Sequence, residues 1–412
     1  MTEKKLILYG AGKIGKRIVE KMNFFKIPVM CLCDADPLKK GMYISSVVVK
    51  NIDEVKAQYK KGEFTIFISI GSRNSLEVKN ELISQGIFDD SDFYDGCIEK
   101  LIIDRLPDKE KRGNCEYYIS AVEKNFLQLD NKLEDTLKEF LLETRFSNEE
   151  YMSTEEGKND FLDHLYRRLD YFRKRTIPWL ESIRPIKNSK ILEIGCGTGA
   201  LTVPLCEQGA RVTAIDLDEQ AMKITGKRLS IYGLSAEIVK LSAVDIKTRF
   251  HGGFDFIIYS ASMEHMTYTE RIQTIKAAYE MLDDSQYIII IETPNRLWHT
   301  DGHTSLEPFF HWLPDELAMD YAKFTSRNRF NQGFDKNSAD DILSFARWGR
   351  GVSYHEFEVA VGRGNLKSIS SMNDFFGVPD DYFKTLLKIN GPHHIDDGFY
   401  EAVLDIALIK NT

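Results

Sequence analysis

The stretch Lys190-Ile-Leu-Glu-Ile-Gly-Cys-Gly-Thr-Gly199 decides the fold of the larger part of this chain. An apolar run at 191–194 stops at the first glycine, and helix-compatible residues follow at 200–208. This order predicts a buried strand, a glycine turn and a helix. Glycines at such a turn let a ligand approach the backbone, and the helix N-terminus offers unpaired N–H groups. Because the acid Glu193 stands beside the turn, we expect the ligand to carry positive charge.

The following segments continue the pattern in the order of a parallel α/β sheet. Strands are predicted at 211–216, 236–241, 254–260 and 287–292, with helical segments between them. The second of these strands ends in Asp216-Leu217-Asp218, about 20 residues past the glycines, where a carboxylate can accept both hydroxyls of a ribose.

These ordered motifs resemble those of class I S-adenosylmethionine-dependent methyltransferases, and the resemblance extends over residues 150–412. It implies an α/β fold with a seven-stranded sheet and S-adenosylmethionine as the cofactor, whose sulfonium and ammonium suit Glu193. In this family an acid after the third strand contacts the adenine, a position that Asp245 matches here. The predicted cofactor-binding residues are Glu193, Gly195, Cys196, Gly197, Asp216, Leu217, Val244, Asp245 and Ser260.

Residues 1–110 predict a second Rossmann-like module. A strand at 6–9 leads into Gly10-Ala-Gly-Lys-Ile-Gly15, which reads G-x-G-x-x-G, and a strand at 28–34 ends at Asp34. The module resembles the nucleotide-sugar-binding N-terminal domains of bacterial sugar acyltransferases. The resemblance implies a nucleotide ligand bound by Gly10, Gly12, Lys13, Ile14, Gly15 and Asp34. The alternative is that the glycines serve only the tight turn and the module binds nothing.

Residues 111–150 are predicted to be a helical linker between the two modules. Apolar residues at three- and four-residue spacing indicate an amphipathic helix at about 116–146, which can pack between domains or form a homodimer seam. A further helix at 161–172 precedes the sheet. In the family that the chain resembles, such a helix forms part of a lid over the cofactor, which makes Tyr166 and Arg167 candidate site residues, whereas Arg167 and Arg168 alternatively form a solvated basic face.

The chain departs from a minimal methyltransferase after the fifth strand, where we expect an inserted lobe at about 295–350. Loops at the carboxyl ends of parallel strands bind substrates, so the lobe's first loop predicts the acceptor pocket. Its predicted substrate-binding residues are Asn295, Arg296, Trp298, His311 and Trp312. Strands at 354–361 and 401–410 are predicted to close the sheet.

Methyl transfer to a hydroxyl requires a base, and a histidine with a pKa near 7 suits that role. His303 in the polar loop is the first candidate and His265, after the fourth strand, is the second. His311, in the same loop as His303, is a further candidate. The alternative for His265 is to cap a helix and orient Glu264, and the alternative for His311 is to pack in the core. The pattern of Asp301, His303 and His311 is not specific enough to predict a metal, so none is expected.

Composition narrows the remaining classes of function. The chain has 412 residues, a formal net charge of −9 and no basic stripe, which argues against a nucleic-acid partner. The longest apolar runs have the length of strands, so no membrane span is expected. Six scattered cysteines predict buried reduced thiols and a cytoplasmic protein.

Together these features predict an S-adenosylmethionine-dependent methyltransferase that O-methylates a sugar or nucleotide-linked glycan precursor in bacterial surface-polysaccharide biosynthesis. One alternative keeps the cofactor but has a small non-sugar acceptor, quinone-like or a carboxylate. Another is a nucleotide-sensing interaction protein with a non-catalytic methyltransferase scaffold. The intact Glu193, Gly195, Gly197, Asp216 and Asp245 argue against this last alternative.

Overall fold

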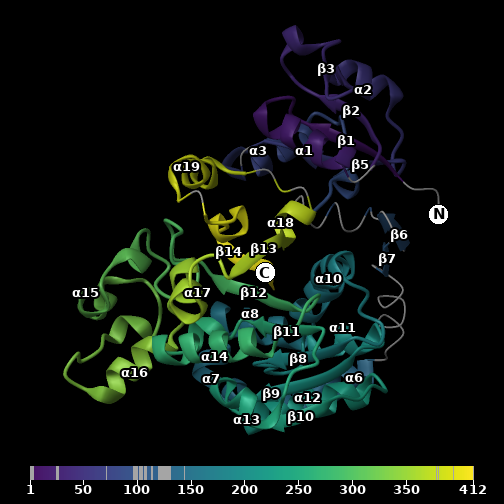
Figure 1. The fold of residues 1–412 in the computed structure, drawn as a ribbon. Helices are drawn as coiled ribbons and strands as arrows, with labels where there is room; N and C mark the ends of the chain where they lie inside the picture. Colours follow the sequence, from purple (N-terminus) through teal and green to yellow (C-terminus); the bar gives the residue numbers. More distant parts are fainter. Residues whose placement is uncertain are drawn as a thin grey trace. The chain divides into compact units, whose positions relative to one another are not determined.

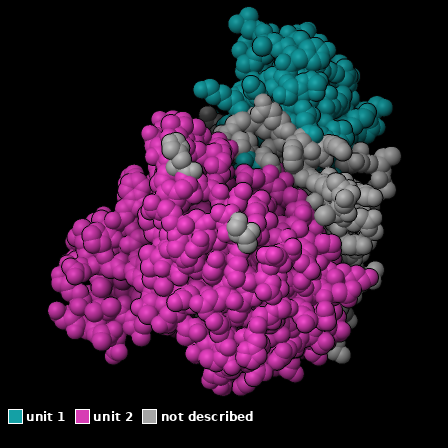
Figure 2. Space-filling model, viewed as in Figure 1, with its two compact units in different colours: residues 1–110, 377–379 teal, residues 111–376, 380–412 magenta. Residues whose placement is uncertain are grey.

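The structure is a computed structural model that describes residues 4–24, 27–70, 72–95, 101, 105, 109–112, 115–118, 131–142, 144–376, 378, 380–392 and 394–411. The chain forms two compact units, shown in Figure 2. Unit 1 consists of residues 1–110 and 377–379, and unit 2 of residues 111–376 and 380–412. No helix in these described ranges combines the length and hydrophobicity that a bilayer span requires.

Unit 1 is a five-stranded α/β sheet in the order β3-β4-β2-β1-β5 (Figure 1). Strands β4, β2, β1 and β5 are parallel and β3 is antiparallel to β4. The elements are β1 (Lys5–Tyr9), α1 (Lys13–Phe24), β2 (Val29–Cys33), β3 (Tyr43–Ile44), β4 (Val47–Lys50), α2 (Ile52–Gln58), β5 (Phe64–Ile68) and α3 (Ser72–Ser84). This order confirms the predicted Rossmann-like α/β module.

The glycine turn of unit 1 is closed by contacts within the chain. Gly10 has φ +115°, and its amide donates a hydrogen bond to the Cys33 carbonyl at 2.7 Å. A Cβ on Gly15 would lie 1.9 Å from the Gly10 carbonyl oxygen, so glycine lets α1 pack directly on the turn. A Cβ on Gly12 would meet no described heavy atom within 4 Å. Packing therefore requires Gly10 and Gly15, and leaves the backbone at Gly12 open.

Unit 2 contains a seven-stranded sheet in the order β10-β9-β8-β11-β12-β14-β13. All neighbours are parallel except β14, which is antiparallel to β12 and β13. The strands are β8 (Lys190–Ile194), β9 (Arg211–Asp216), β10 (Glu237–Lys240), β11 (Phe256–Ser260), β12 (Tyr287–Pro294), β13 (Leu366–Ser371) and β14 (Val403–Lys410). The predicted seven-stranded sheet is confirmed.

Helices flank the sheet and fill the connections between strands. Those that follow β8, β9, β10 and β11 are α11 (Thr202–Glu207), α12 (Glu219–Ile231), α13 (Ile246–Arg249) and α14 (Tyr268–Met281). One face of the sheet forms the largest described part of the core, with Leu192, Ile257 and Ile290 packed against Ile275 of α14. The chain runs from β13 through α18 (Met372–Phe375) and α19 (Tyr382–Asn390) to β14.

The strand predicted at 354–361 is wrong, because this segment is the helix α17 (Tyr354–Val361). Ser353 and Glu356 form a capping box at its start, a signal that favours a helix. The buried Tyr354 and Phe357 are three residues apart, which suits a helix packed on the sheet and not an alternating strand. The edge strand is β13 instead.

The inserted lobe has its own small core around Phe310, Phe330 and Phe345. It contains α15 (Asp315–Tyr321) and α16 (Ala339–Arg347) with several 3₁₀ turns. Aromatic rings fill this core, with the centroids of Phe310 and Phe330 5.7 Å apart.

The segment predicted as a helical linker is only partly helical. Two short strands, β6 (Lys109–Arg112) and β7 (Cys115–Tyr118), stand at its beginning, and the helix α6 (Asn131–Leu142) follows. Residues 119–130 of the predicted helix lie outside the described residues. Leu137 and Leu141 of α6 are buried against Leu165 and Ile224 of the same unit. The part of the apolar stripe that they form is therefore covered within the chain, so the homodimer seam remains a prediction without support from α6.

The segment before the sheet contains two π-helical turns, Asp163–Arg167 and Phe172–Thr176. Arg228 of α12, which is fully buried, fastens the first turn to the glycine turn of β8. Its guanidinium donates to the carbonyls of Thr198 at 2.8 Å and Leu165 at 3.1 Å, and to that of His164. Burial lowers the pKa of Arg228 to about 10, so the group stays charged at pH 7.

We expect Arg228→Met to destabilise unit 2 by about 2–4 kcal/mol, because it removes the hydrogen bonds from a buried guanidinium to three backbone carbonyls. Urea unfolding followed by tryptophan fluorescence measures this, since all four tryptophans lie in unit 2. The matched control is Lys223→Met, an exposed position on the same helix, which should change stability by no more than about 0.5 kcal/mol. Equal stability of the two variants would contradict the clamp role of Arg228.

Candidate functional site

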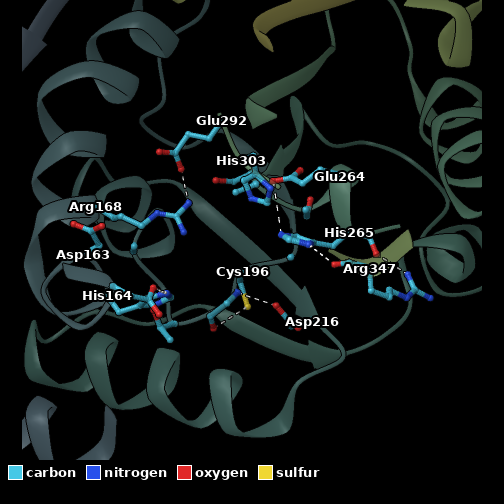
Figure 3. A pocket seen from close by; sticks show the side chains of 18 of the residues that line it. Asp163, His164, Arg168, Cys196, Asp216, Glu264, His265, Glu292, His303 and Arg347 are labelled. Atoms are coloured by element: carbon cyan, nitrogen blue, oxygen red, sulfur yellow. Dashed lines mark hydrogen bonds and ion pairs between the residues drawn. The ribbon is translucent and has the colours of Figure 1, made fainter. Parts of the chain in front are cut away.

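A cavity of about 1240 Å³ opens at the carboxyl ends of the strands of unit 2 (Figure 3). Four neighbouring strands contribute side chains to its wall: Glu193 of β8, Asp216 of β9, Ser260 of β11 and Glu292 of β12. Parallel strands bring their carboxyl ends to one edge of a sheet, so residues far apart in sequence meet here. The volume exceeds the ~300–1,000 Å³ usual for one small ligand, which leaves room for two.

The turn after β8 has the left-handed backbone that glycine tolerates. Gly195, Gly197 and Gly199 have φ values of +77°, +52° and +79°. A Cβ on Gly195 would lie 2.6 Å from the Cβ of Ser262, and one on Gly199 would lie 3.0 Å from the Thr225 side chain. A Cβ on Gly197 would have no described heavy atom within 4 Å. Packing thus requires the outer two glycines, whereas Gly197 leaves the backbone open to a ligand.

Asp216 holds this turn in place. Its Oδ2 accepts a hydrogen bond from the Gly197 amide at 2.8 Å, and its Oδ1 accepts from the amides of Leu217 at 2.7 Å and Asp218 at 3.0 Å. A carboxylate offers about four lone-pair positions, so about one remains for a ligand. Asp216 lines the cavity and shares its carboxylate with the turn, and its predicted contact with a ribose stays a prediction.

Glu193 is buried in the floor of the cavity. Thr202 Oγ1 donates a hydrogen bond to its Oε2 at 2.7 Å. Burial raises the pKa of Glu193 to about 8, the Thr202 hydrogen bond opposes that rise and the charge of Asp216 adds to it. The carboxyl group is therefore mainly protonated at pH 7. A cation placed beside it would favour the ionised form. The neighbouring Cys196 thiol is buried as well, and burial raises its pKa.

The segment before the sheet forms another wall. Arg168 makes an ion pair with Glu292, and its guanidinium lies 5.5 Å from the Phe172 ring centroid. Glu292 has φ +54°, and its amide donates to Asp405 Oδ1 at 2.7 Å. This left-handed conformation lies at the irregular register of β12. Such backbone outliers gather at functional sites, because the surrounding structure must hold them.

The lid prediction named the wrong arginine. Arg168 lines the cavity, whereas Arg167 is exposed and pairs with Asp163 at 3.4 Å. The side chain of Tyr166 lies outside the described ones. His164 belongs to the same wall and lies 3.0 Å from Thr198 Oγ1.

The first two histidines predicted as bases line the cavity, with the ring centroids of His265 and His303 5.4 Å apart. Burial, together with the neighbouring His265, lowers the pKa of His303 to about 4. A general base works best with a pKa near the operating pH, so His303 is a poor proton acceptor at pH 7. Burial therefore argues against the base role predicted for His303.

Two predicted cofactor residues do not belong to the described wall. The turn after β10 contributes Leu241 and Ala243 to the cavity in place of Val244 and Asp245. Asp245 is exposed and its carbonyl accepts a hydrogen bond from Thr248 at 2.7 Å. The predicted adenine contact of Asp245 thus has no support in this cavity.

The predicted acceptor residues also lie outside the described cavity wall: Asn295, Arg296, Trp298, His311 and Trp312. Asn295 donates to the carbonyls of Phe399 and Glu401 at 2.7 Å, which fastens the end of β12. His311 is buried and its Nε2 lies 3.2 Å from Asp301. This agrees with the alternative that His311 is a packed core residue. The loop's contribution to the wall is His303.

Arg296, Trp298 and Trp312 have other partners. The Arg296 guanidinium lies 5.4 Å from the Tyr268 ring centroid and its Nη2 lies 3.7 Å from Asp315. Trp298 and Trp312 both pack against Phe383 of α19, at centroid distances of 5.1 Å and 6.4 Å. The structure therefore packs Trp298 and Trp312, two of the predicted substrate-binding residues, on Phe383 and not in the described cavity wall.

Several residues of the cavity wall were not predicted from the sequence as site residues. The most informative are His164, Arg168, Glu264, Glu292 and Arg347. Glu292 ends the strand predicted at 287–292 as Asp216 ends the one at 211–216, so its position was a usable signal, although β12 continues to Pro294. Arg347 comes from the inserted lobe, and no local pattern in the sequence ties it to this sheet.

A family model described as "Methyltransferase domain" matches residues 191–285, which contain most of the strand-end residues above and none of unit 1. A ubiquinone biosynthesis O-methyltransferase of Thiobacillus denitrificans is 33% identical over 88 residues, which is 21% of this chain and 38% of that protein. The enzyme of the same name from Bartonella quintana is 29% identical over 159 residues, or 38% and 62% of the two chains.

The provisionally named methyltransferase YqeM of Bacillus subtilis is 31% identical over 185 residues, which cover 44% of this chain and 68% of that protein. The chain thus spans more than two thirds of YqeM, but less than two thirds of the two ubiquinone biosynthesis enzymes.

The buried Glu193 predicts a pH dependence of stability. Its pKa of about 8 in the folded chain exceeds the value of about 4.3 in unfolded chains, so folding takes up a proton between these pH values. The free energy of unfolding should therefore fall as pH rises from about 4.3 to about 8, by up to about 1.4 kcal/mol per pH unit from this group. Glu193→Gln should remove that contribution. Unfolding curves of both proteins at pH 5 to 9 measure it, and parallel pH dependences would contradict the assignment.

Proposed function

Because this chain belongs to the methyltransferase family, we propose that it transfers a methyl group from S-adenosylmethionine to a hydroxyl group of a small-molecule acceptor. Relatives that carry the name O-methyltransferase support an oxygen acceptor. The volume of the cavity, about 1240 Å³, suits a cofactor together with an acceptor.

The observation that carries this proposal is the open backbone at Gly197 above the buried carboxyl of Glu193. A ligand that fills the space beside Gly197 can approach the backbone of the turn closely, and it meets a carboxyl group that ionises next to positive charge. The remaining lone pair of Asp216 can accept one hydroxyl, and Leu241 and Ala243 offer apolar surface to a base. These residues fit S-adenosylmethionine, which supplies a methyl group already activated on its sulfonium.

The protein's contribution is placement and the exclusion of water. Arg228 and Asp216 hold the glycine turn, and the Arg168–Glu292 pair supports the wall opposite. Fixed placement of two reactants can supply effective molarities of about 10⁵–10⁸ M, so a rigid wall contributes directly to rate.

For the acceptor we propose a nucleotide-linked or phosphorylated sugar. The inserted lobe adds the cationic side chains of Arg327, Arg329 and Arg347 to the cavity wall, which suits an anionic acceptor. Each already has a neighbour: Arg327 pairs with Glu156, Arg347 with Glu270, and Arg329 lies over the Tyr151 ring. An anionic acceptor would therefore bind to arginine side chains that already have a protein neighbour. A quinone-like acceptor is the second candidate, because of the names of the relatives.

Unit 1 is proposed to hold the nucleotide part. The open backbone at Gly12 precedes α1, whose N-terminus offers free N–H groups to a phosphate. Asp34 accepts hydrogen bonds from the Ala11 amide at 2.7 Å and the Asp36 amide at 2.9 Å, and it pairs with Lys39. Its role in the turn therefore resembles that of Asp216, and its remaining capacity for a ligand is small.

The cofactor proposal predicts the effect of Gly197→Ala. A methyl group there fills the open space, so affinity for S-adenosylmethionine should fall about tenfold or more in calorimetry. Gly233→Ala is the matched control, because Gly233 has φ +66°, is exposed and also has no described heavy atom within 4 Å of a Cβ. The Gly233→Ala variant carries the same backbone strain and should bind S-adenosylmethionine with the affinity of the wild-type protein. Equal losses in both variants would refute the open-turn assignment.

The nucleotide proposal predicts that nucleotide sugars raise the melting temperature of the full chain, and that Gly12→Val abolishes the shift. Gly12 has no left-handed φ and open space around its Cα, so the variant should melt at the wild-type temperature without ligand. Shifts that persist in the variant would assign binding to another place. No shift with any nucleotide sugar or nucleotide would make unit 1 structural.

A further inference from the structure

Three side chains with metal-ligating atoms converge at the edge of the cavity. Glu264 and His265 follow β11, and His303 lies in the loop after β12, about forty residues further along the chain. One ligand atom from each of the three lies within 4.8 Å of the other two. Figure 3 shows the two imidazoles and the carboxylate turned toward one another. His265 Nε2 lies 3.9 Å from Glu264 Oε1.

The carboxylate of Glu264 is buried without adequate partners. Its residue is 0% exposed, and its Oε1 has no hydrogen-bond partner among the described residues. The carboxylate has a long contact with Thr293 Oγ1, at 3.4 Å from its other oxygen, and a hydrogen bond within Glu264 itself. An unpaired buried carboxylate is costly, so this atom requires a proton or a cation. The unpartnered oxygen is the one that faces His265.

His265 is oriented as a ligand would be. Its Nδ1 lies 2.8 Å from the carbonyl oxygen of Arg347. A carbonyl only accepts hydrogen bonds, so Nδ1 carries the hydrogen and Nε2 presents its lone pair toward Glu264. Metal-bound histidines usually have this arrangement, in which a backbone carbonyl fixes the tautomer. Arg347 is itself fixed by two hydrogen bonds of 2.6 Å to Glu270.

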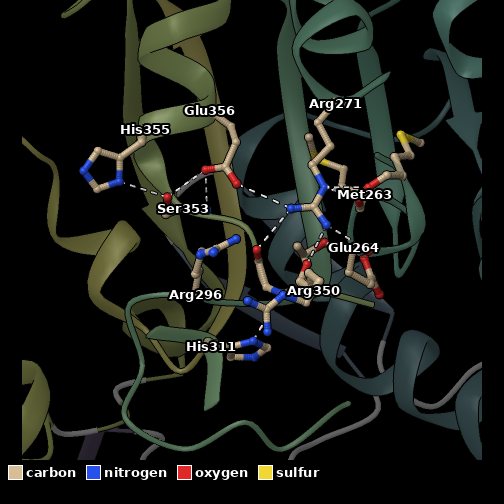
Figure 4. A network of polar contacts seen from close by, with 12 residues as sticks. Met263, Glu264, Arg271, Arg296, His311, Arg350, Ser353, His355 and Glu356 are labelled. Atoms are coloured by element: carbon tan, nitrogen blue, oxygen red, sulfur yellow. Dashed lines mark hydrogen bonds and ion pairs between the residues drawn. The ribbon is translucent and has the colours of Figure 1, made fainter. Parts of the chain in front are cut away.

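A buried guanidinium supports the same residues from behind (Figure 4). Arg271 of α14 is 1% exposed and pairs with Glu356 at 3.4 Å. It donates to five backbone carbonyls, those of Met263, Glu264, Met266, Arg350 and Gly351. It thereby joins the Glu264–His265 turn to the segment beside His303. That segment packs closely, since a Cβ on Gly349 would lie 2.4 Å from His303 Cε1.

We propose that Glu264, His265 and His303 bind one divalent transition-metal ion that holds and activates the acceptor hydroxyl. This rests on the proposed function for the acceptor, but the metal site stands on the geometry alone. Two imidazoles and a carboxylate suit Zn²⁺, Mn²⁺, Co²⁺ or Fe²⁺ and not Mg²⁺ or Ca²⁺, which prefer oxygen ligands. Ligands at about 2.1 Å from a metal are about 3.4 Å apart, so the site must contract by about 1 Å. His265, whose side chain is 46% exposed, has the freedom to do so.

The metal acts on the acceptor as a Lewis acid. An acceptor hydroxyl bound to it loses its proton more readily, and the proton passes to water. The oxygen then forms a bond to the methyl carbon, and the carbon–sulfur bond breaks to leave an uncharged thioether. Neither histidine then needs to act as the base, which agrees with the burial of His303.

The test is a titration of chelator-treated full-length protein with Co²⁺, followed by visible absorption. We expect one saturable site, which Zn²⁺ displaces and Mg²⁺ does not. Glu264→Gln and His265→Asn should each weaken Co²⁺ binding about tenfold or more. His265→Asn changes a half-exposed side chain, so it keeps the test valid if Glu264→Gln fails to fold. The control is His251→Asn, an exposed histidine outside the cluster, which should leave the affinity unchanged.

Calorimetry with S-adenosylmethionine separates this inference from the proposed function. Normal cofactor binding without a saturable Co²⁺ site would overturn the metal and leave Glu264 and His265 as a proton-transfer pair. Co²⁺ binding that the two cluster variants do not weaken would overturn the assignment of ligands. A Co²⁺ site weakened as expected, in a protein that binds no S-adenosylmethionine, would support the metal and refute the proposed function.

Discussion

The site depends on hydrogen bonds from buried guanidinium groups to the backbone carbonyls of loops. Arg228 joins the glycine turn to the segment before the sheet, and Arg271 joins the turn after β11 to the end of the inserted lobe. Each arginine replaces the regular backbone pairing that turns lack, and a buried carbonyl without a donor would cost about 1–3 kcal/mol. Guanidinium suits this role, because it presents five donors in a fixed plane and keeps its charge when buried. These two side chains tie the loops of the cavity wall to the helices α12 and α14.

The two units use the same device at the start of their sheets. In each, an acid at or just after the end of the second strand accepts a backbone amide of the glycine turn: Asp34 from Ala11 at 2.7 Å and Asp216 from Gly197 at 2.8 Å. In each, one glycine of the turn faces open space, Gly12 in unit 1 and Gly197 in unit 2. The acid thus shapes the turn before any ligand arrives. An acid about 20 residues past a glycine turn therefore indicates the turn geometry at least as strongly as it indicates a ribose contact.

The sequence predicted the sheet well because its signals are local. The strands at 191–194 and 254–260 are apolar runs that end at glycine or small polar residues, and the structure has β8 and β11 there. The strand predicted at 354–361 was wrong, because the apolar residues of this segment also fit the alternating pattern of a strand. The capping box of Ser353 and Glu356, which favours a helix, was overlooked. Most of the site could not be read from the sequence in this way. Arg168, Glu292 and Arg347 are brought to one cavity only by the fold. Trp298 and Trp312 of the loop after β12 pack on Phe383 and do not line that cavity. Composition indicated a polar, aromatic loop but not the direction in which its side chains point.

Features that oppose folding gather at the same edge of the sheet. Ala261 and Glu292 have φ values of +45° and +54°, a conformation that costs a non-glycine residue about 1–3 kcal/mol. Buried polar side-chain atoms without a partner number six among the described residues, and three of them, in Ser262, Glu264 and Arg327, belong to residues of the cavity wall. Glu193 adds a buried acid that is protonated at neutral pH. The core on one face of the sheet is packed mainly with Ile and Leu side chains, and the hydroxyl of its buried Tyr259 is hydrogen-bonded to Thr274. Half of these unpartnered atoms lie in the wall of one cavity, where a polar, partly cationic ligand can supply the hydrogen bonds and the charge that the folded chain lacks.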